Sequence, residues 1–190
     1  MVCVSHKLWP DLMQLSPFNS QQAQSVIQLF NQVFSASEGE SEGQLVSDFV
    51  EQLMHTTPAN DLFGFIAHSD IQIQGCIFFS RLVLSSGQNA FILSPVAISS
   101  DSQGKGIGQQ LIKYGLAQLQ ASEVEYVFTY GDPSFYSRFG FESISESQIK
   151  APFTLSHPDG WLALAFEGYA INDLTGSCQC VEALNVPALW

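Results

Sequence analysis

The residues of this chain best suited to chemistry form a glycine-rich turn at mid-chain, Gln103-Gly104-Lys105-Gly106-Ile107-Gly108. The turn follows an apolar, strand-like run, residues 91–98, and precedes an amphipathic, helix-like run, residues 107–120. Such a turn exposes backbone N–H groups at a helix N-terminus, where the helix dipole also favours an anion. Because glycine has no Cβ atom, a ligand can approach the backbone closely. The turn therefore predicts a phosphate or pyrophosphate site, and with it a phosphorylated cofactor.

Two common phosphate loops do not match this turn. The P-loop reads G-x-x-x-x-G-K-[ST], but Ser99 stands where its first glycine would be, and Gly106 follows Lys105. The dinucleotide fingerprint reads G-x-G-x-x-G and lies early in a βαβ unit, whereas this chain has G-x-G-x-G at mid-chain. The pattern that remains is Q-x-x-G-x-G.

The Q-x-x-G-x-G pattern resembles the acyl-CoA pyrophosphate loop of the GNAT superfamily of N-acyltransferases. A second segment, Tyr130 to Phe141, resembles the part of that superfamily that follows strand five, where a short helix carries a tyrosine and ends in Gly-Phe. Two motifs in the right order and spacing make the resemblance specific, over roughly residues 8–150. It implies an α/β (α+β) GNAT fold, with a mixed, mostly antiparallel sheet that is splayed between strands 4 and 5 and flanked by helices. We expect a single domain over residues 1–190, with residues 151–190 as a C-terminal strand extension.

The resemblance also implies which residues bind acetyl-CoA, the expected cofactor. In GNAT enzymes the strand before the loop bulges, and its opened backbone groups pair with the pantetheine arm and the acyl carbonyl. Pro95 interrupts that strand here, and proline by itself indicates a bulge or an edge strand equally; the resemblance favours the bulge. The expected cofactor-binding residues lie on this strand, on the loop and at the start of the second motif: Val96, Ala97, Ile98, Gln103, Gly104, Lys105, Gly106, Ile107, Gly108, Gln109 and Asp132.

The implied reaction is direct attack of a primary amine on acetyl-CoA in a ternary complex. Tyr136 stands at the superfamily's tyrosine position, and a tyrosine, with an ordinary pKa of about 10, can protonate the departing sulfur. Tyr136 could instead be an aromatic core residue, and Tyr130 is the alternative acid. The resemblance implies that a general base could be a carboxylate on the strand before the loop, but residues 91–98 contain none. No general base is therefore legible, and water is an alternative acceptor of the proton. The candidates elsewhere more often have solvated or structural roles: Glu123, Glu125, Asp48, His55 and His68.

Acidic residues indicate where the acceptor enters. In this superfamily the first two helices and their loop usually border the acceptor opening. That loop here carries an acidic rim, Glu38, Glu40 and Glu42, which is followed by Asp48 and Glu51 in the second helix. A negative rim attracts an ammonium group, whereas an apolar interior favours the neutral amine needed for attack. The expected acceptor is a small or peptide-like amine, cationic in solution. The alternative is that these carboxylates only keep the protein soluble.

The helices that carry these residues can be placed from caps and apolar spacing. Asn19 or Ser20 caps a first helix, residues 35–43 are expected to be a loop, and Ser41 with Gln44 forms a capping box for a second helix. After the glycine-turn helix, a short helix is expected with Asp132 as its cap, Pro133 as its first residue and Gly140 at its end.

The expected strands are extended runs between these helices and polar turns: residues 62–68, 73–84, 90–98, 124–130, 141–149 and 161–166. The first three should be antiparallel. The fourth follows a crossover helix and should pair in parallel with the third.

Charge and composition limit the partners. The chain has 190 residues, 46% of them hydrophobic, and can bury one sizeable core. Its formal net charge of −12 argues against nucleic acid and anionic membrane surfaces. Three of its six basic residues, Lys105, Lys113 and Arg138, lie on segments expected near the glycine turn, where they would supply a positive field for a polyanionic cofactor.

The location is expected to be cytoplasmic. No apolar stretch approaches the roughly 18 residues of a membrane-spanning helix, and no secretory leader is visible. The four cysteines are expected to be reduced thiols rather than metal ligands: Cys3, Cys76, Cys178 and Cys180. A homodimer remains open.

Two other classes of function remain open beside the acetyltransferase. A non-catalytic acyl-CoA-binding or regulatory module is favoured by the missing strand carboxylate and opposed by Tyr136. A protein-interaction domain with a coincidental glycine turn would bind no CoA. Turnover of acetyl-CoA with a panel of amines distinguishes these classes.

Overall fold

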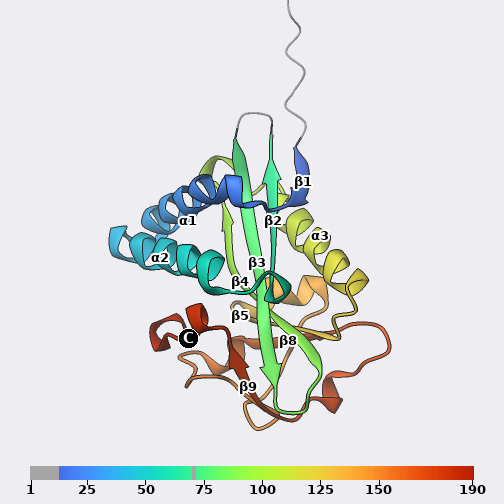
Figure 1. Ribbon diagram of the computed structural model, residues 1–190. Coiled ribbons are helices and arrows are strands. Elements are labelled where there is room, and N and C mark those ends of the chain that lie inside the picture. Colours follow the sequence, from blue (N-terminus) through green and yellow to red (C-terminus); the bar gives the residue numbers. More distant parts are fainter. Residues whose placement is uncertain (1–12, 70–71) are drawn as a thin grey trace, which may run out of the picture.

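A mixed β-sheet runs through the part of the chain that the structure, a computed structural model, describes: residues 13–69 and 72–190 (Figure 1). Its strands are β1 (Gln14–Pro17), β2 (Leu62–His68), β3 (Ile73–Leu84), β4 (Asn89–Ile98), β5 (Tyr126–Tyr130), β6 (Glu142–Ser143), β7 (Ile149–Lys150), β8 (Trp161–Ala165) and β9 (Gly176–Cys180). They follow the order β1-β2-β3-β4-β5-β8-β6, with β9 pairing to β3 and β7. The β4–β5 and β7–β9 pairs are parallel and the others antiparallel. This topology confirms the expected fold class.

Helices cover both faces of the sheet. One face carries α1 (Ala23–Glu38) and α2 (Glu40–Thr56), and the other carries α3 (Ile107–Ala121), as Figure 1 shows. Because successive strand residues point to opposite faces, Phe78 of β3 packs with the α1/α2 cluster and Phe79 with the α3 cluster. Short helices α4 (Pro133–Tyr136) and η4 (Ser137–Phe139) follow β5. Within the described ranges, no helix has the length and apolarity required to cross a bilayer.

The first two helices differ from expectation at their junction. Asn19 does form a capping box, with Gln22, for η1 (Ser20–Gln22), which leads into α1. The expected loop over residues 35–43 is wrong, because only Gly39, with φ +102°, separates the two helices. The Ser41–Gln44 capping box is also wrong, since the cap position is Gly39. Glu40 and its neighbours can be helical because their side chains are largely exposed. Acidic side chains in the first turn also stabilise a helix through their favourable interaction with the helix dipole.

The strands were largely anticipated, apart from the weakest elements. The parallel β4–β5 pair is confirmed, although β5 begins two residues later than expected, after a turn in which Glu123 has φ +59°. The run over residues 141–149 holds only β6 and the first residue of β7. The patterns did not reveal β1 and β9. Both are short, and each depends on pairing with a distant strand, β2 and β3 respectively.

The sheet opens between β4 and β5. These strands pair from Ala90–Tyr126 to Leu93–Thr129 and no further. At the same level, Ser94 and Pro95 of β4 oppose the single residue Phe78 of β3, which is the expected bulge. The edge-strand alternative for Pro95 is wrong, because β4 lies between β3 and β5. Beyond the bulge, residues 96–98 pair only with β3, so their other backbone edge faces the opening, which we call the splay.

Candidate functional site

The glycine turn forms an open backbone cradle at the start of α3. Gly104 and Gly106 have φ values of +73° and +78°, in the left-handed region that favours glycine. Gly106 is the N-cap of α3 and provides no side-chain cap, so the first-turn N–H groups of residues 107–109 have no capping side chain. A Cβ atom at Gly104 or Gly106 would meet no heavy atom within 4 Å, so this side of the backbone is open. The cradle is suited to a diphosphate.

A cavity of about 250 Å³ lies over this cradle, and we call it the loop cavity. Its lining includes the predicted strand residue Ile98 and six predicted loop residues: Gln103, Gly104, Gly106, Ile107, Gly108 and Gln109. Two lining residues were not predicted, Ser102 and Phe135. The Gln103 side chain also donates from Nε2 to the Ile98 carbonyl at 3.1 Å, which ties the turn to the end of β4. Lys105 is exposed and does not line this cavity.

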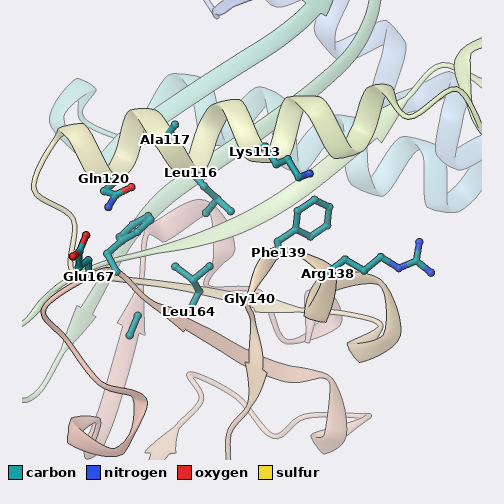
Figure 2. Close-up of a pocket in the computed structure, with 11 residues that line it drawn as sticks. Lys113, Leu116, Ala117, Gln120, Arg138, Phe139, Gly140, Leu164 and Glu167 are labelled. Atoms are coloured by element: carbon teal, nitrogen blue, oxygen red, sulfur yellow. The ribbon is translucent and has the colours of Figure 1, made fainter.

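A second hollow of about 480 Å³, the α3 groove, lies between α3, η4 and β8 (Figure 2). Lys113 of α3 and Arg138 of η4 lie at one end, on either side of Phe139, and Glu167 lies at the other. In the described part of the chain, the recorded ion pair is Arg81–Asp61 at 2.9 Å, so neither Lys113 nor Arg138 has a carboxylate partner there. Two unpaired cations are therefore available to an anion in this groove.

A third cavity, the splay cavity, lies where β4 and β5 separate, and its volume is about 290 Å³. It brings together α1, α2, the β4 bulge, β5, α4 and a C-terminal turn: Phe34, Glu42, Val46, Phe49, Leu93, Ser94, Pro95, Val96, Tyr130, Tyr136, Ala188 and Leu189. Apart from one carboxylate, one serine and two tyrosines, these side chains are apolar. The cavity can therefore accommodate a small group that has both polar and apolar parts.

Tyr136 lines the splay cavity and is also packed among aromatic rings. Its ring centroid lies 5.1 Å from that of Phe135 and 5.7 Å from that of Phe141. Burial raises the pKa of Tyr136, and a hydrogen bond with the Thr129 hydroxyl partly opposes this shift. Gly131 provides space for the ring, since a Cβ atom there would lie 2.7 Å from Cε2 of Tyr136. The hydroxyl is therefore held in its neutral, proton-carrying form beside the splay.

Helix α4 lies where the two cavities approach each other. Consecutive residues face different cavities, Phe135 the loop cavity and Tyr136 the splay cavity. The end of β4 does the same, with Pro95 and Val96 in the splay cavity and Ile98 in the loop cavity. A donor held at the glycine turn and an acceptor held under α2 could thus meet at the splay.

The predicted cap of α4 is present. Asp132 accepts from the Ser134 backbone N–H at 2.8 Å and from the Ser134 hydroxyl at 2.9 Å. These bonds hold the pKa of the Asp132 carboxyl below its ordinary value. Asp132 lines none of the three cavities, so its evident role is to start α4 and thereby position Tyr136.

The carboxylate that reaches the splay cavity is Glu42, from the predicted acidic rim; Glu38 and Glu40 do not line it. None of the five candidate bases lines it either. Asp48 accepts from the Gln44 side chain at 2.7 Å, and Glu125 accepts from the Asn89 N–H at 2.9 Å. The alternative acid, Tyr130, does line the splay cavity, and its oxygen accepts from the His157 N–H at 2.7 Å.

Sequence reasoning did not identify the apolar walls of the splay cavity. Phe34 and Phe49 belong to amphipathic patterns that look like any helix core. Ala188 and Leu189 lie in a C-terminal stretch without a motif. Two apolar residues of the cavity did give a signal, Pro95 as the proline that marks the bulge and Val96 on the strand expected to bind the cofactor.

Comparison with known proteins agrees with this geometry. Residues 60–143 match the family model described as an acetyltransferase (GNAT) domain. This part of the chain is therefore similar to a GNAT acetyltransferase domain. The match includes the glycine turn and Tyr136, whereas α1, α2 and the C-terminal turn that wall the splay cavity lie outside it.

Two proteins similar to this chain are named as N-acetyltransferases. The chain is 29% identical over 161 residues to the uncharacterized N-acetyltransferase YhbS of Escherichia coli. The aligned region covers 78% of this chain and 86% of YhbS. The chain is also 26% identical over 149 residues to the uncharacterized N-acetyltransferase YjhQ of Escherichia coli. This aligned region covers 75% of this chain and 82% of YjhQ.

Solved structures share the GNAT fold. A GNAT family acetyltransferase from Brucella melitensis, in complex with acetyl-CoA, is 25% identical with a TM-score of 0.73, over 92% of this chain and 99% of that one. YhbS from Escherichia coli, in complex with CoA, is 24% identical with a TM-score of 0.78, over 95% and 96%.

Proposed function

We propose that the protein is an acetyl-CoA-dependent N-acetyltransferase that acetylates a primary amine by direct attack. The observation that carries this proposal is the pair of cavities, one at the glycine turn and one beneath α1 and α2, that both reach the end of β4 and helix α4. We further propose that residues 1–190 act as one domain, because the C-terminal turn completes the wall of the splay cavity.

The glycine turn fits the diphosphate of acetyl-CoA. Its open left-handed glycines and the first-turn N–H groups of residues 107–109 would hold the phosphates, and Val96, Ala97 and Ile98 present a strand edge that no neighbour occupies. Lys113 and Arg138 would add a local positive field in a chain whose net charge is −12. When bound, acetyl-CoA supplies a thioester whose carbonyl carbon an amine attacks, with CoA as the leaving group.

The splay cavity would hold the acceptor. Glu42 stands at the start of α2 and would attract an ammonium group, while the apolar lining favours the neutral amine required for attack. The acceptor is therefore a small amine, or the end of a peptide-like amine, that is cationic in solution.

Tyr136 would assist departure of the sulfur with its hydroxyl proton. An ordinary thiol has a pKa of about 8.5, below the raised pKa of Tyr136, so complete proton transfer to a thiolate is uphill. We therefore assign Tyr136 as a hydrogen-bond donor to the developing negative charge on sulfur. Water carries away the proton that the attacking amine loses and protonates the CoA thiolate.

The experiment is a CoA-release assay on the full chain with acetyl-CoA and a panel of cationic, neutral and anionic amines at low salt. We expect turnover with cationic amines, and Glu42→Gln should lower kcat/KM for them about tenfold. Glu51→Gln is the matched control, because Glu51 lies on the same helix and does not line the cavity. CoA binding without turnover on any amine would favour the acyl-CoA-binding module, and absence of CoA binding would exclude both functions.

A further inference from the structure

The C-terminal turn η8 (Pro187–Leu189) reaches the acceptor side of the molecule from the far end of the chain. Figure 1 shows the C-terminus beside α2. Ala188 and Leu189 line the splay cavity together with Glu42 and Tyr136. This turn lies outside residues 60–143, which match the family model. The family match therefore does not account for this wall of the cavity.

Trp190 anchors the turn. Its side chain is only 6% exposed, and its ring lies 6.0 Å from Trp161 and 6.4 Å from Tyr130, centroid to centroid. Its indole Nε1 donates to the Leu184 carbonyl at 3.0 Å, and its own carbonyl accepts from the Ser156 hydroxyl at 3.0 Å. A wall held by buried rings and two hydrogen bonds keeps a defined position, as a surface that selects by size requires.

The turn presents an apolar surface to a small volume. The splay cavity measures about 290 Å³, the space of about ten water molecules at roughly 30 Å³ each. Glu42 supplies the carboxylate, and Leu189 and Ala188 are among the aliphatic side chains that line the same cavity. A ligand that places an ammonium group near the carboxylate and a short hydrocarbon arm on this wall satisfies both features.

We propose that Leu189 is a specificity-determining residue, whose side chain sets the length of the apolar arm that an acceptor amine can carry. This proposal rests on the proposed function for the identity of the acceptor site. The ligand class is a primary amine with a short aliphatic arm. Each methylene that reaches the wall should improve binding about threefold to fourfold, until the arm meets Leu189.

The test is calorimetric binding of primary n-alkylamines, from propyl to decyl, to the full chain saturated with CoA. Leu189→Ala should move the tightest-binding amine to a longer chain and weaken the amine preferred by the original protein about tenfold. Leu189→Phe should move the optimum to a shorter chain. Val186→Ala is the matched control, because Val186 lies just before the same turn, is 37% exposed and does not line the cavity.

Two results would overturn the proposal: no binding of any alkylamine, or the same order of affinities in both Leu189 variants as in the original protein. CoA affinity serves as the check on folding, since Leu189 does not line the loop cavity. Acetyl transfer to the same amines is measured separately. Size-dependent binding without transfer would contradict the proposed reaction and leave the assignment of Leu189 standing.

Discussion

Replacement of Tyr136 by phenylalanine isolates the hydroxyl that the proposed reaction requires. The ring keeps its contacts with Phe135 and Phe141, so the side chain should stay in place. The variant loses one hydrogen bond with Thr129, whose own hydroxyl still donates to the Leu93 carbonyl at 3.1 Å. The expected loss of stability is about 0.5–1.5 kcal/mol, too little to unfold a typical domain.

The effect on catalysis should be larger than the effect on stability. Because burial raises the pKa of Tyr136, full proton transfer to a thiolate is unfavourable, and the benefit is that of a hydrogen bond to a charged acceptor. Such a bond contributes about 1.5–3 kcal/mol, which corresponds to a roughly 10- to 150-fold decrease in kcat. CoA affinity should not change, because Tyr136 does not line the loop cavity.

The assay compares kcat, the KM for acetyl-CoA and the Kd for CoA among three single variants. Tyr114→Phe is the control, because Tyr114 packs on Phe65 and lines none of the three cavities. Tyr130→Phe tests the alternative acid. A decrease in kcat of less than threefold for Tyr136→Phe would refute the assignment, and a larger decrease for Tyr130→Phe would transfer the role to Tyr130.

The pH profile provides a second check on the same assignment. Tyr136 must be protonated to donate, and its raised pKa moves the loss of that proton above the ordinary value of about 10. No decline in kcat attributable to Tyr136 is therefore expected below pH 10. A decline between pH 7 and 9 that disappears in Tyr136→Phe would contradict the direction of the shift.

Three further changes test the cofactor site and the core. Gly106→Val should weaken CoA binding at least 100-fold by calorimetry, whereas Gly87→Val, at another open left-handed glycine, should lose stability but bind CoA normally. Lys113→Ala should weaken CoA binding and reduce the dependence of CoA affinity on salt concentration. Lys150→Ala is the control, because Lys150 is exposed on β7 and lines none of the cavities. The same salt dependence in Lys113→Ala as in the original protein would contradict the proposed positive field. Burial raises the pKa of Cys178 from 9.0 to about 12. Its neutral thiol therefore makes its whole contribution to the free energy of unfolding below pH 9, and this contribution is lost as the pH rises toward 12. Urea unfolding should show a decline of up to about 1.4 kcal/mol per pH unit from this thiol above pH 9, and Cys178→Ala should remove that component.

The turn proposed to bind the cofactor was predictable because its signals are local. The φ values at Gly104 and Gly106 and the start of α3 depend mainly on neighbouring residues. The short helix that carries Tyr136 is equally local, with its Asp132 cap and the terminal Gly140. The strands from 62 to 98 followed from alternation and turns within a few residues.

The cavity proposed for the acceptor was decided by tertiary structure. Residues 35–43 appeared too polar and small to continue a helix, yet packing of two helices against the sheet left only Gly39 between them and placed Glu42 in the splay cavity. The bulge at Pro95 was ambiguous until its position between β3 and β5 was known. Leu189 gave no signal at all, because its role depends on Trp190 docking against Trp161 and Tyr130, far away along the chain. Local sequence determines backbone geometry within a few residues, whereas a cavity enclosed by six separate segments exists only when long-range packing brings them together.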